Sequence, residues 1–378
     1  MRVILAGGGT GGHIYPAITI AREVARRDPN TEILFIGSKR GLENELVPKE
    51  GFRLLTLQLE GIPRRISLKV FKSLGLAGKG IGEAYKIMKE FRPDLVIGTG
   101  GYVCGPVVMT ARLMGIPTAI QEQNAFPGLT NRLLGKVVDR VFLAYGEAAR
   151  YFNPKKVKIF GNPIRTAEFQ EVSRPVAERN MGIQSGRTNL LIFGGSQSAR
   201  RINQCFMDIL PKMLAGFPNL QIIMMTGGKD YEATESRVKE MDIQSSQRSR
   251  LFLTPYFYKI ADAYIVSDLV LARAGAISLA EITYFGIPAL LIPYPFATNN
   301  HQEYNARELE KKNAALVLLE KELTPETLWN HLSLLLNDAD KRRKMSSASK
   351  SLGKPSATED IVNELLKIAT KKVLSPEF

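Results

Sequence analysis

The glycine-rich run at residues 7–13, Gly-Gly-Gly-Thr-Gly-Gly-His, is the feature that most constrains what this chain can fold into. It follows an apolar strand pattern at residues 3–6. Apolar residues then recur at helical spacing over residues 17–25, so a helix is expected to begin near Pro16. Strand, glycine loop and helix open a βαβ unit. The loop N–H groups and the helix N-terminus form an anion site, with the titratable side chain of His13 beside it.

Two interpretations of this loop are open at this point. Gly7, Gly9 and Gly12 match the dinucleotide fingerprint G-x-G-x-x-G, which also requires a carboxylate at the end of the second strand to hold a ribose. The second strand, residues 33–36, runs into Gly-Ser-Lys-Arg and shows no such carboxylate. That cationic end could suit a phosphorylated ribose, so NADP is disfavoured without being excluded. In the second interpretation, the glycines only permit a tight turn and close packing.

The same pattern recurs along the chain. A second glycine loop follows the strand at residues 94–97, and a third follows the strand at residues 189–193. Strands that alternate with helices predict parallel sheets, and the restart after residues 161–165 predicts two doubly wound α/β domains. Ligands bind at the carboxyl ends of such strands. The first two glycine loops and the polar residues 121–124 are therefore expected to point at one crevice.

Length and composition place the chain in a class. Its 378 residues predict two domains. Cys104 and Cys205 cannot build a disulfide framework or a zinc site, which indicates a reducing compartment. The strand at Val3 leaves no room for a signal peptide, and no apolar run approaches the roughly 18 residues of a membrane span. We therefore expect a cytoplasmic protein or one bound to the cytoplasmic face of a membrane.

The net charge of +14 predicts an anionic partner. Nucleic acid is disfavoured because the cations are dispersed and no binding motif accompanies them, which leaves anionic lipid or a phosphorylated substrate. Residues 61–92 interleave cations with apolar residues, as segments that lie on anionic membranes do. An amphipathic helix with a solvated basic face is the alternative. The glycines within this segment argue against one continuous helix; they are Gly75, Gly78, Gly80 and Gly82.

The second half carries a carboxylate early in a predicted helix. Glu281 could accept both hydroxyls of a ribose, but Ser278 and Glu281 also have capping-box spacing, and the sequence favours neither reading. The irregular polar loop at residues 293–302 follows a buried strand, where loops often bind ligands. Asp338-Ala339-Asp340 is interpreted as a solvated charge cluster rather than a magnesium site.

Seven dispersed motifs resemble those of the MurG family, in glycosyltransferase family 28. Together they cover essentially the whole chain, at residues 8–13, 100–106, 122–124, 161–165, 194–197, 273–281 and 301–302. Members transfer N-acetylglucosamine (GlcNAc) from UDP-GlcNAc to the MurNAc 4-hydroxyl of lipid I, an undecaprenyl-diphosphate-MurNAc-pentapeptide, giving lipid II for peptidoglycan. The resemblance implies a GT-B fold of two Rossmann-like domains facing across a cleft. It places a membrane-associating acceptor domain at residues 1–163, a UDP-GlcNAc domain at 164–345 and a helix returning to the first domain at 346–378.

The resemblance also implies site residues. His13 would be the catalytic base, with Asn124 also near the acceptor hydroxyl, and the acceptor diphosphate would meet Gly9, Gly101 and Tyr102. Arg165 and Ser196 would bind the donor diphosphate, Phe257 the uracil and Gln302 the GlcNAc hydroxyls. The remaining positions implied for UDP-GlcNAc are Thr10, Gly11, Gly12, Asn124, Ala276, Ile277, Ser278, Leu279, Ala280 and Glu281. The family usually has glycine where this chain has Ser198, so the third loop is expected to be less permissive.

An α-linked donor and a β-linked product require a single in-line displacement, with a base for the hydroxyl and positive potential for the leaving diphosphate. His13, with an unperturbed pKa near 6.5, suits the base; a diphosphate ligand and a structural donor are its alternative roles. Arg165, loop N–H groups and a helix N-terminus could supply the potential without a metal, and no cofactor is implied.

The partners implied are UDP-GlcNAc, lipid I, an anionic membrane surface and other proteins of cell-wall synthesis, with no nucleic acid. The chain would act as a peripheral protein on the cytoplasmic face of the bacterial plasma membrane. Two rival functions are a nucleotide-sugar epimerase, which has no use for a basic membrane-facing patch, and a dinucleotide-dependent reductase, which leaves the second-half motifs unexplained.

Overall fold

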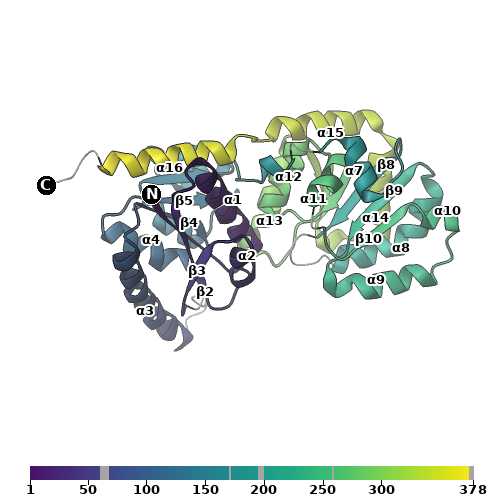
Figure 1. Cartoon of the computed structure of the whole chain (residues 1–378). Coiled ribbons are helices and arrows are strands. Elements are labelled where there is room, and N and C mark those ends of the chain that lie inside the picture. Colours follow the sequence, from purple (N-terminus) through teal and green to yellow (C-terminus); the bar gives the residue numbers. More distant parts are fainter. Residues whose placement is uncertain (60–67, 170–171, 195–199, 258, 374–378) are drawn as a thin grey trace. The chain divides into compact units, whose positions relative to one another are not determined.

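The computed structural model describes residues 1–59, 68–169, 172–194, 200–257 and 259–373 (Figure 1). It divides into two compact units, Met1–Ile164 with Lys354–Phe378, and Arg165–Gly353. The second division lies at residue 353 rather than near 345, because helix α15 (Ala339–Leu352) continues through the expected boundary.

The first unit is built on a seven-stranded parallel sheet with the order β3-β2-β1-β4-β5-β6-β7. The direction of winding reverses between β1 and β4, which makes the carboxyl ends of these two strands the expected ligand site. The strands are β1 (Arg2–Gly7), β2 (Glu32–Ser38), β3 (Arg53–Leu57), β4 (Leu95–Gly100), β5 (Thr118–Glu122), β6 (Arg140–Leu143) and β7 (Val157–Ile159).

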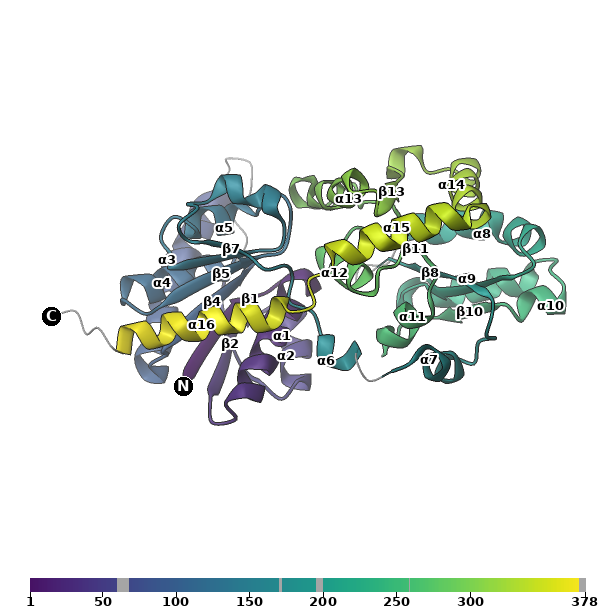
Figure 2. The same cartoon turned by 90° about the horizontal axis from the view of Figure 1, so that it is seen from above.

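Helices cover both faces of this sheet (Figure 2). Alternate residues of β1 supply the two cores: Val3 and Leu5 pack with helix α1, whereas Ile4 and Ala6 pack with α3 and α4. Strands buried on both faces read as continuous apolar runs, which is why they are visible in the sequence. The helices are α1 (Gly11–Arg27), α2 (Glu43–Lys49), α3 (Leu68–Phe91), α4 (Cys104–Leu113), α5 (Leu129–Leu134), η1 (Gly146–Tyr151) and α16 (Ala357–Val373).

Helix α1 begins earlier than the sequence suggested. We expected its start near Pro16, but Thr10 is the N-cap and its carbonyl accepts from the N–H groups of His13 and Ile14 at 3.1 and 3.2 Å. Pro16 therefore lies inside the helix. Gly11 and Gly12 lie in the first helical turn, which brings His13 onto the helix instead of leaving it in the preceding loop.

The prediction that glycines interrupt the segment before β4 was wrong, because α3 is one continuous helix from Leu68 to Phe91. Close packing explains part of this result. A Cβ atom at Gly80 would lie 2.5 Å from Leu59 Cδ2, so glycine is the residue that lets the helix approach the end of β3. Ala84 and Met88 then bury the next turns against the sheet.

The second unit repeats the plan with a six-stranded parallel sheet, ordered β10-β9-β8-β11-β12-β13, and its winding reverses between β8 and β11. The strands are β8 (Thr188–Phe193), β9 (Leu220–Met225), β10 (Leu251–Thr254), β11 (Leu269–Ala272), β12 (Ala289–Leu291) and β13 (Ala315–Val317). The helices are α6 (Thr166–Phe169), α7 (Arg174–Met181), α8 (Arg200–Gly216), α9 (Gly228–Glu240), α10 (Ser245–Arg248), α11 (Ile260–Val266), α12 (Ala276–Phe285), η2 (Thr298–Asn300), α13 (His301–Lys311), η3 (Glu320–Glu322), α14 (Pro325–Asn337) and α15.

The last helix belongs to the core of the first unit. Both views show α16 beside α1 (Figures 1 and 2). Its apolar residues recur at helical spacing and join the cluster of Val3 and Leu5; they are Ile361, Val362, Leu365, Ile368 and Ala369. Arg140 on β6 pairs with Glu364 at 2.9 Å beside this seam. In the described part of the chain, no helix is both long enough and apolar enough to cross a membrane.

Replacing Leu365 with Ala should destabilise the first unit by about 2–5 kcal/mol, because a fully buried leucine leaves a cavity. Denaturant unfolding followed by circular dichroism would measure this loss. Lys367→Ala is the matched control on the same helix, since its side chain is 70% exposed. Equal stability of the two variants would show that α16 is not part of the core.

Candidate active site

The two glycine loops of the first unit touch each other directly. A Cβ atom at Gly101 would lie 2.6 Å from the carbonyl oxygen of Gly8, and one at Gly100 would lie 2.7 Å from Cδ2 of His13. Gly100 and Gly101 also have φ values of 116° and 82°, which favour glycine. The loops after β1 and β4 therefore form one continuous surface, as their positions along the chain suggested. Thr10 and Gly12 are exposed on it, and Tyr102 is half-buried beside it.

The ring of His13 is half-buried at this junction. Its Nδ1 lies 3.2 Å from the carbonyl oxygen of Gly8 and 3.5 Å from the Thr10 hydroxyl. A carbonyl can only accept, so the bond to Gly8 places a proton on Nδ1 and leaves the lone pair of the neutral ring on Nε2. Burial lowers the pKa of His13 from its ordinary 6.5, although the Gly8 hydrogen bond and the charge of Glu43 act in the opposite direction. The ring is therefore neutral at pH 7, as a general base must be.

A carboxylate does lie at the end of the second strand, so the prediction that none stands there was wrong. Glu43 begins helix α2, and the chain reverses so that its side chain reaches the end of β2. The fully buried carboxylate accepts from Ser38 N at 2.8 Å, from the Ser38 hydroxyl at 2.6 Å and from Gly9 N at 2.9 Å. Both oxygens are thus engaged within the protein. This carboxylate holds the glycine loop and is not open to a ribose.

The polar residues 121–124 divide into three buried residues and a half-buried end. Gln121 and Gln123 are buried and tie the strand ends together, Gln123 Nε2 donating to the carbonyl of Thr99 at 2.6 Å. Glu122 is also buried and accepts from the backbone N–H and side-chain amide of Asn124 at 3.0 and 3.1 Å. Burial raises the pKa of Glu122, against the lowering effect of these hydrogen bonds. Of the four residues, Asn124 is the one that is only half-buried.

In the second unit, Glu281 is at the centre of a buried polar cluster. Tyr264 on α11 donates to Glu281 Oε2 at 3.0 Å, and an Arg165 nitrogen lies 3.9 Å from Oε1. Burial raises the pKa of Glu281, partly offset by Arg165 and by the Tyr264 hydrogen bond. Nη1 of Arg165 also lies 3.3 Å from Oε2 of Glu168. Tyr264 has no motif around it that would have identified it from sequence.

The capping-box interpretation of Ser278 and Glu281 was wrong. The N-cap of α12 is Gly275, which has no side chain, so Ser278 lies within the first turn and Glu281 one turn further on. The helix also has no acidic residue in its first turn. Its N-terminus therefore presents the positive end of the helix dipole, which favours an anionic ligand. Ala276 is buried and Ile277, Ser278 and Ala280 are half-buried, but the side chain of Leu279 is fully buried and could serve a ligand only through its backbone.

Gln302 joins two loops at the same edge of the second sheet. Its Oε1 accepts from Ala274 N at 3.2 Å and from Tyr294 N at 3.0 Å. Since the oxygen is used, the carboxamide nitrogen is the group that can donate to a ligand hydroxyl. Phe257 is half-buried just after β10. Ser196 and Ser198 lie outside the described residues, so the expectations for the third glycine loop are not tested.

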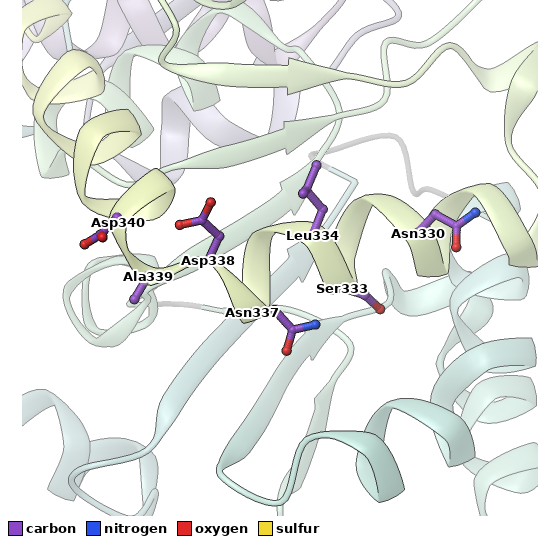
Figure 3. Close-up of a pocket in the computed structure, with 7 residues that line it drawn as sticks. All are labelled: Asn330, Ser333, Leu334, Asn337, Asp338, Ala339 and Asp340. Atoms are coloured by element: carbon purple, nitrogen blue, oxygen red, sulfur yellow. The ribbon is translucent and has the colours of Figure 1, made fainter.

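The aspartates of the Asp-x-Asp sequence have structural roles. Asp338 caps α15 by accepting from Lys341 N at 2.8 Å, and Asp340 pairs with Arg343. They border a hollow of about 550 Å³ that is lined by residues of α14 and α15 (Figure 3). The predicted site residues lie elsewhere in the chain. Within the described ranges, no three His, Cys, Asp or Glu side chains gather as metal ligands would.

Comparisons with known proteins agree with this arrangement. Residues 3–143 match the glycosyltransferase family 28 N-terminal domain, and residues 189–361 match the glycosyltransferase family 28 C-terminal domain. A relative from Thermoanaerobacter pseudethanolicus is 46% identical over 96% of this chain and 98% of its own. One from Acetivibrio thermocellus is 43% identical over 97% and 99%. Both are named UDP-N-acetylglucosamine–N-acetylmuramyl-(pentapeptide) pyrophosphoryl-undecaprenol N-acetylglucosamine transferase.

Solved structures give the same result for the fold. The crystal structure of Acinetobacter baumannii MurG is 28% identical, with a TM-score of 0.74 over 97% of this chain and 99% of that one. The UDP-GlcNAc 2-epimerase of Neisseria meningitidis bound to UDP-GlcNAc shares the fold alone, at 15% identity and a TM-score of 0.69 over 97% and 100%. The expected α/β architecture with two Rossmann-like domains of the GT-B type is confirmed. The chain belongs to glycosyltransferase family 28 and, within it, to the MurG family.

Proposed function

We propose that this chain is an inverting glycosyltransferase that moves GlcNAc from UDP-GlcNAc to the MurNAc 4-hydroxyl of lipid I, forming lipid II. The observation that carries the proposal is the placement of His13, a neutral imidazole with its Nε2 lone pair available at the junction of two glycine loops. Family membership supplies the substrates, because the relatives are named for this donor and this lipid-linked acceptor.

The chemistry follows from these groups. The acceptor hydroxyl gives its proton to Nε2 of His13 as its oxygen attacks C1 of GlcNAc, and the bond from C1 to the UDP oxygen breaks on the opposite face. The α-linked donor thus gives a β-linked product in one step. Negative charge grows on the departing diphosphate, where the N-terminus of α12 and the guanidinium of Arg165 can stabilise it.

The roles of the donor residues are part of this proposal. The Glu281 carboxylate is suited to accept the ribose hydroxyls, and the amide nitrogen of Gln302 to donate to a GlcNAc hydroxyl. Phe257 offers a flat apolar face for the uracil. Gly9, Gly101 and Tyr102 belong to the loop surface on which we place the acceptor diphosphate.

Labelled UDP-GlcNAc incubated with and without a polyprenyl-diphosphate-linked acceptor tests the function. We expect label in the lipid product only when the acceptor is present. Acceptor-independent conversion of the nucleotide sugar would indicate an epimerase instead. Turnover that requires NADPH would indicate a reductase.

Replacing His13 with Gln should lower kcat by about 10²–10⁴-fold and leave the affinity for UDP-GlcNAc nearly unchanged, because glutamine keeps hydrogen bonding without a titrating base. In the wild type, kcat/KM should fall only as the pH drops below the lowered pKa of His13, that is, below 6.5. Steady-state kinetics across pH would measure both effects.

His331→Gln is the matched control, since His331 bonds the Thr327 carbonyl within helix α14 of the second unit. Near-normal turnover in His13→Gln would exclude His13 as the base. Substrate binding that strengthens at low pH would instead identify it as a cationic diphosphate ligand.

Glu281→Ala should weaken UDP-GlcNAc binding by about 1–3 kcal/mol, roughly 5- to 150-fold, because the ribose loses a buried acceptor. Donor affinity in the wild type should also decline as the pH falls towards the raised pKa of Glu281, above the ordinary value of 4.5. Calorimetric titration would measure both, with Glu235→Gln, a carboxylate 40% exposed on α9, as the control. Unchanged donor affinity with lowered thermal stability would assign Glu281 a structural role.

We also propose that helix α3 docks the protein on anionic membrane at the cytoplasmic face. Residues 61–67 of the proposed membrane segment lie outside the described part. In the described part, Ile81 and Tyr85 are 39% and 48% exposed, and the neighbouring lysines Lys79, Lys86 and Lys89 are exposed as well. Apolar side chains beside cations are suited to the boundary between acyl chains and anionic headgroups.

Changing Lys79, Lys86 and Lys89 together to Gln should weaken binding to vesicles that contain phosphatidylglycerol, by about fivefold per lysine. Turnover of a water-soluble acceptor should persist. Lys155→Gln, at another exposed site of the first unit, is the control for net charge. An affinity for vesicles that depends neither on lipid charge nor on these substitutions would contradict membrane docking through α3.

A further inference from the structure

The peptide group between Gly8 and Gly9 is hydrogen bonded at both ends. Its N–H, from Gly9, donates to Oε2 of Glu43 at 2.9 Å. Its carbonyl, from Gly8, accepts from Nδ1 of His13 at 3.2 Å. One unbroken chain of hydrogen bonds therefore leads from a carboxylate, through a single peptide group, to the imidazole that we assign as the base.

The environment of the carboxylate that begins this series of hydrogen bonds stabilises its charged form. Glu43 is fully buried, and its Oε1 accepts from both the N–H and the hydroxyl of Ser38. Burial alone would raise the pKa of Glu43, but the hydrogen bonds from Ser38 and Gly9 outweigh it and hold the pKa below its usual value. Glu43 is thus anionic at neutral pH.

Three glycines make room for this side chain. A Cβ atom at Gly8 would lie 2.5 Å from Glu43 Oε1, one at Gly37 would lie 2.6 Å from its Cγ, and one at Gly41 would collide with its Oε2. None of the three has a positive φ, so space rather than backbone conformation is what glycine provides there. The glycine loop, the end of β2 and the start of α2 all leave space for the same buried carboxylate.

We propose that Glu43 is a positioning residue that acts on His13 through the Gly8–Gly9 peptide. In a serine hydrolase, a carboxylate bonds Nδ1–H of the catalytic histidine directly, fixing its tautomer and stabilising the imidazolium. Here the peptide group transmits the same influence, since bonds in a chain polarise one another. The effect of this role on turnover rests on the proposed transferase function.

The surroundings of His13 leave Glu43 as the group that sets its charge environment. The loop after β4 faces the ring with Gly100, and the first turn of α1 contains no acidic residue. In the described part of the chain, the charged group that acts on the ring is Glu43, which favours the imidazolium. Removing this negative charge must therefore lower the pKa of His13 and move the acid limb of kcat/KM to lower pH.

Nitrogen-15 NMR of the labelled full-length protein tests the chain of hydrogen bonds directly. The sequence has three histidines. The signals of His13 are assigned by their absence from the spectrum of the His13→Gln variant. The wild type should show the Nδ1–H tautomer. Glu43→Gln should lower the His13 pKa, by less than the about 1–3 pH units of a direct contact, and should mix the tautomers.

Kinetics of the same variant supply the second readout. Glu43→Gln should lower kcat by about 10- to 100-fold, less than loss of a carboxylate that bonds the histidine directly. The KM for UDP-GlcNAc should stay the same, and the acid limb should move with the NMR pKa. Glu45→Gln, on the same helix with a side chain 63% exposed, should match the wild type.

Ser38→Ala separates this role from a structural one, because it removes one buried hydrogen bond and keeps the carboxylate. It should lower thermal stability and leave the His13 tautomer unchanged. A wild-type Nε2–H tautomer would overturn the proposal even if Glu43→Gln did not fold. A folded Glu43→Gln protein with the wild-type His13 pKa and pH profile would overturn it too. If lipid transfer itself failed, the NMR results would still stand on their own.

Discussion

Direct contact between two glycine loops is the constraint on which the first unit depends. Gly101 approaches the Gly8 carbonyl so closely that no side chain fits at that position. The contact is possible because β1 and β4 are neighbours in a parallel sheet whose winding reverses between them. The buried carboxylate of Glu43 holds the same loop from the other side. The carbonyl that bonds Nδ1 of His13 belongs to this loop.

The two units share one architecture but carry different groups around the points where their sheets reverse winding. At the reversal point of the first unit, the structure places a neutral imidazole and positive-φ glycines. Around the corresponding point of the second unit it places a helix N-terminus without a side-chain cap, with Arg165 and Glu281 in the same unit. Proton transfer is suited to the first set of groups, and binding of a nucleoside diphosphate to the second. This division supports the account of donor and acceptor roles.

Much of the fold was predictable because buried parallel strands are continuous apolar runs. The first glycine loop was recognisable because it directly follows one of these runs. Two short edge strands, β3 and β13, were not identified, and each is only partly buried. Helix α3 was misjudged because local glycine propensity counts for less than packing against Leu59.

The site was less predictable than the fold, for reasons of geometry. Glu43 stands five residues beyond the end of β2 in the sequence, and only the chain reversal brings its carboxylate back to Ser38. The capping-box spacing of Ser278 and Glu281 was misleading because a glycine, Gly275, starts the helix. Tyr264 reaches Glu281 from a different helix. Such contacts depend on tertiary structure, and no local pattern records them.

In the proposed mechanism, one in-line displacement with His13 as base joins the sugar to its acceptor. The anomeric configuration of the product tests it most directly. Proton NMR of the disaccharide released from the lipid product should show a β-linked GlcNAc at the MurNAc 4-hydroxyl, inverted from the α-linked donor. An α-linked product would contradict the account, because retention requires a second displacement for which the proposed mechanism has no step.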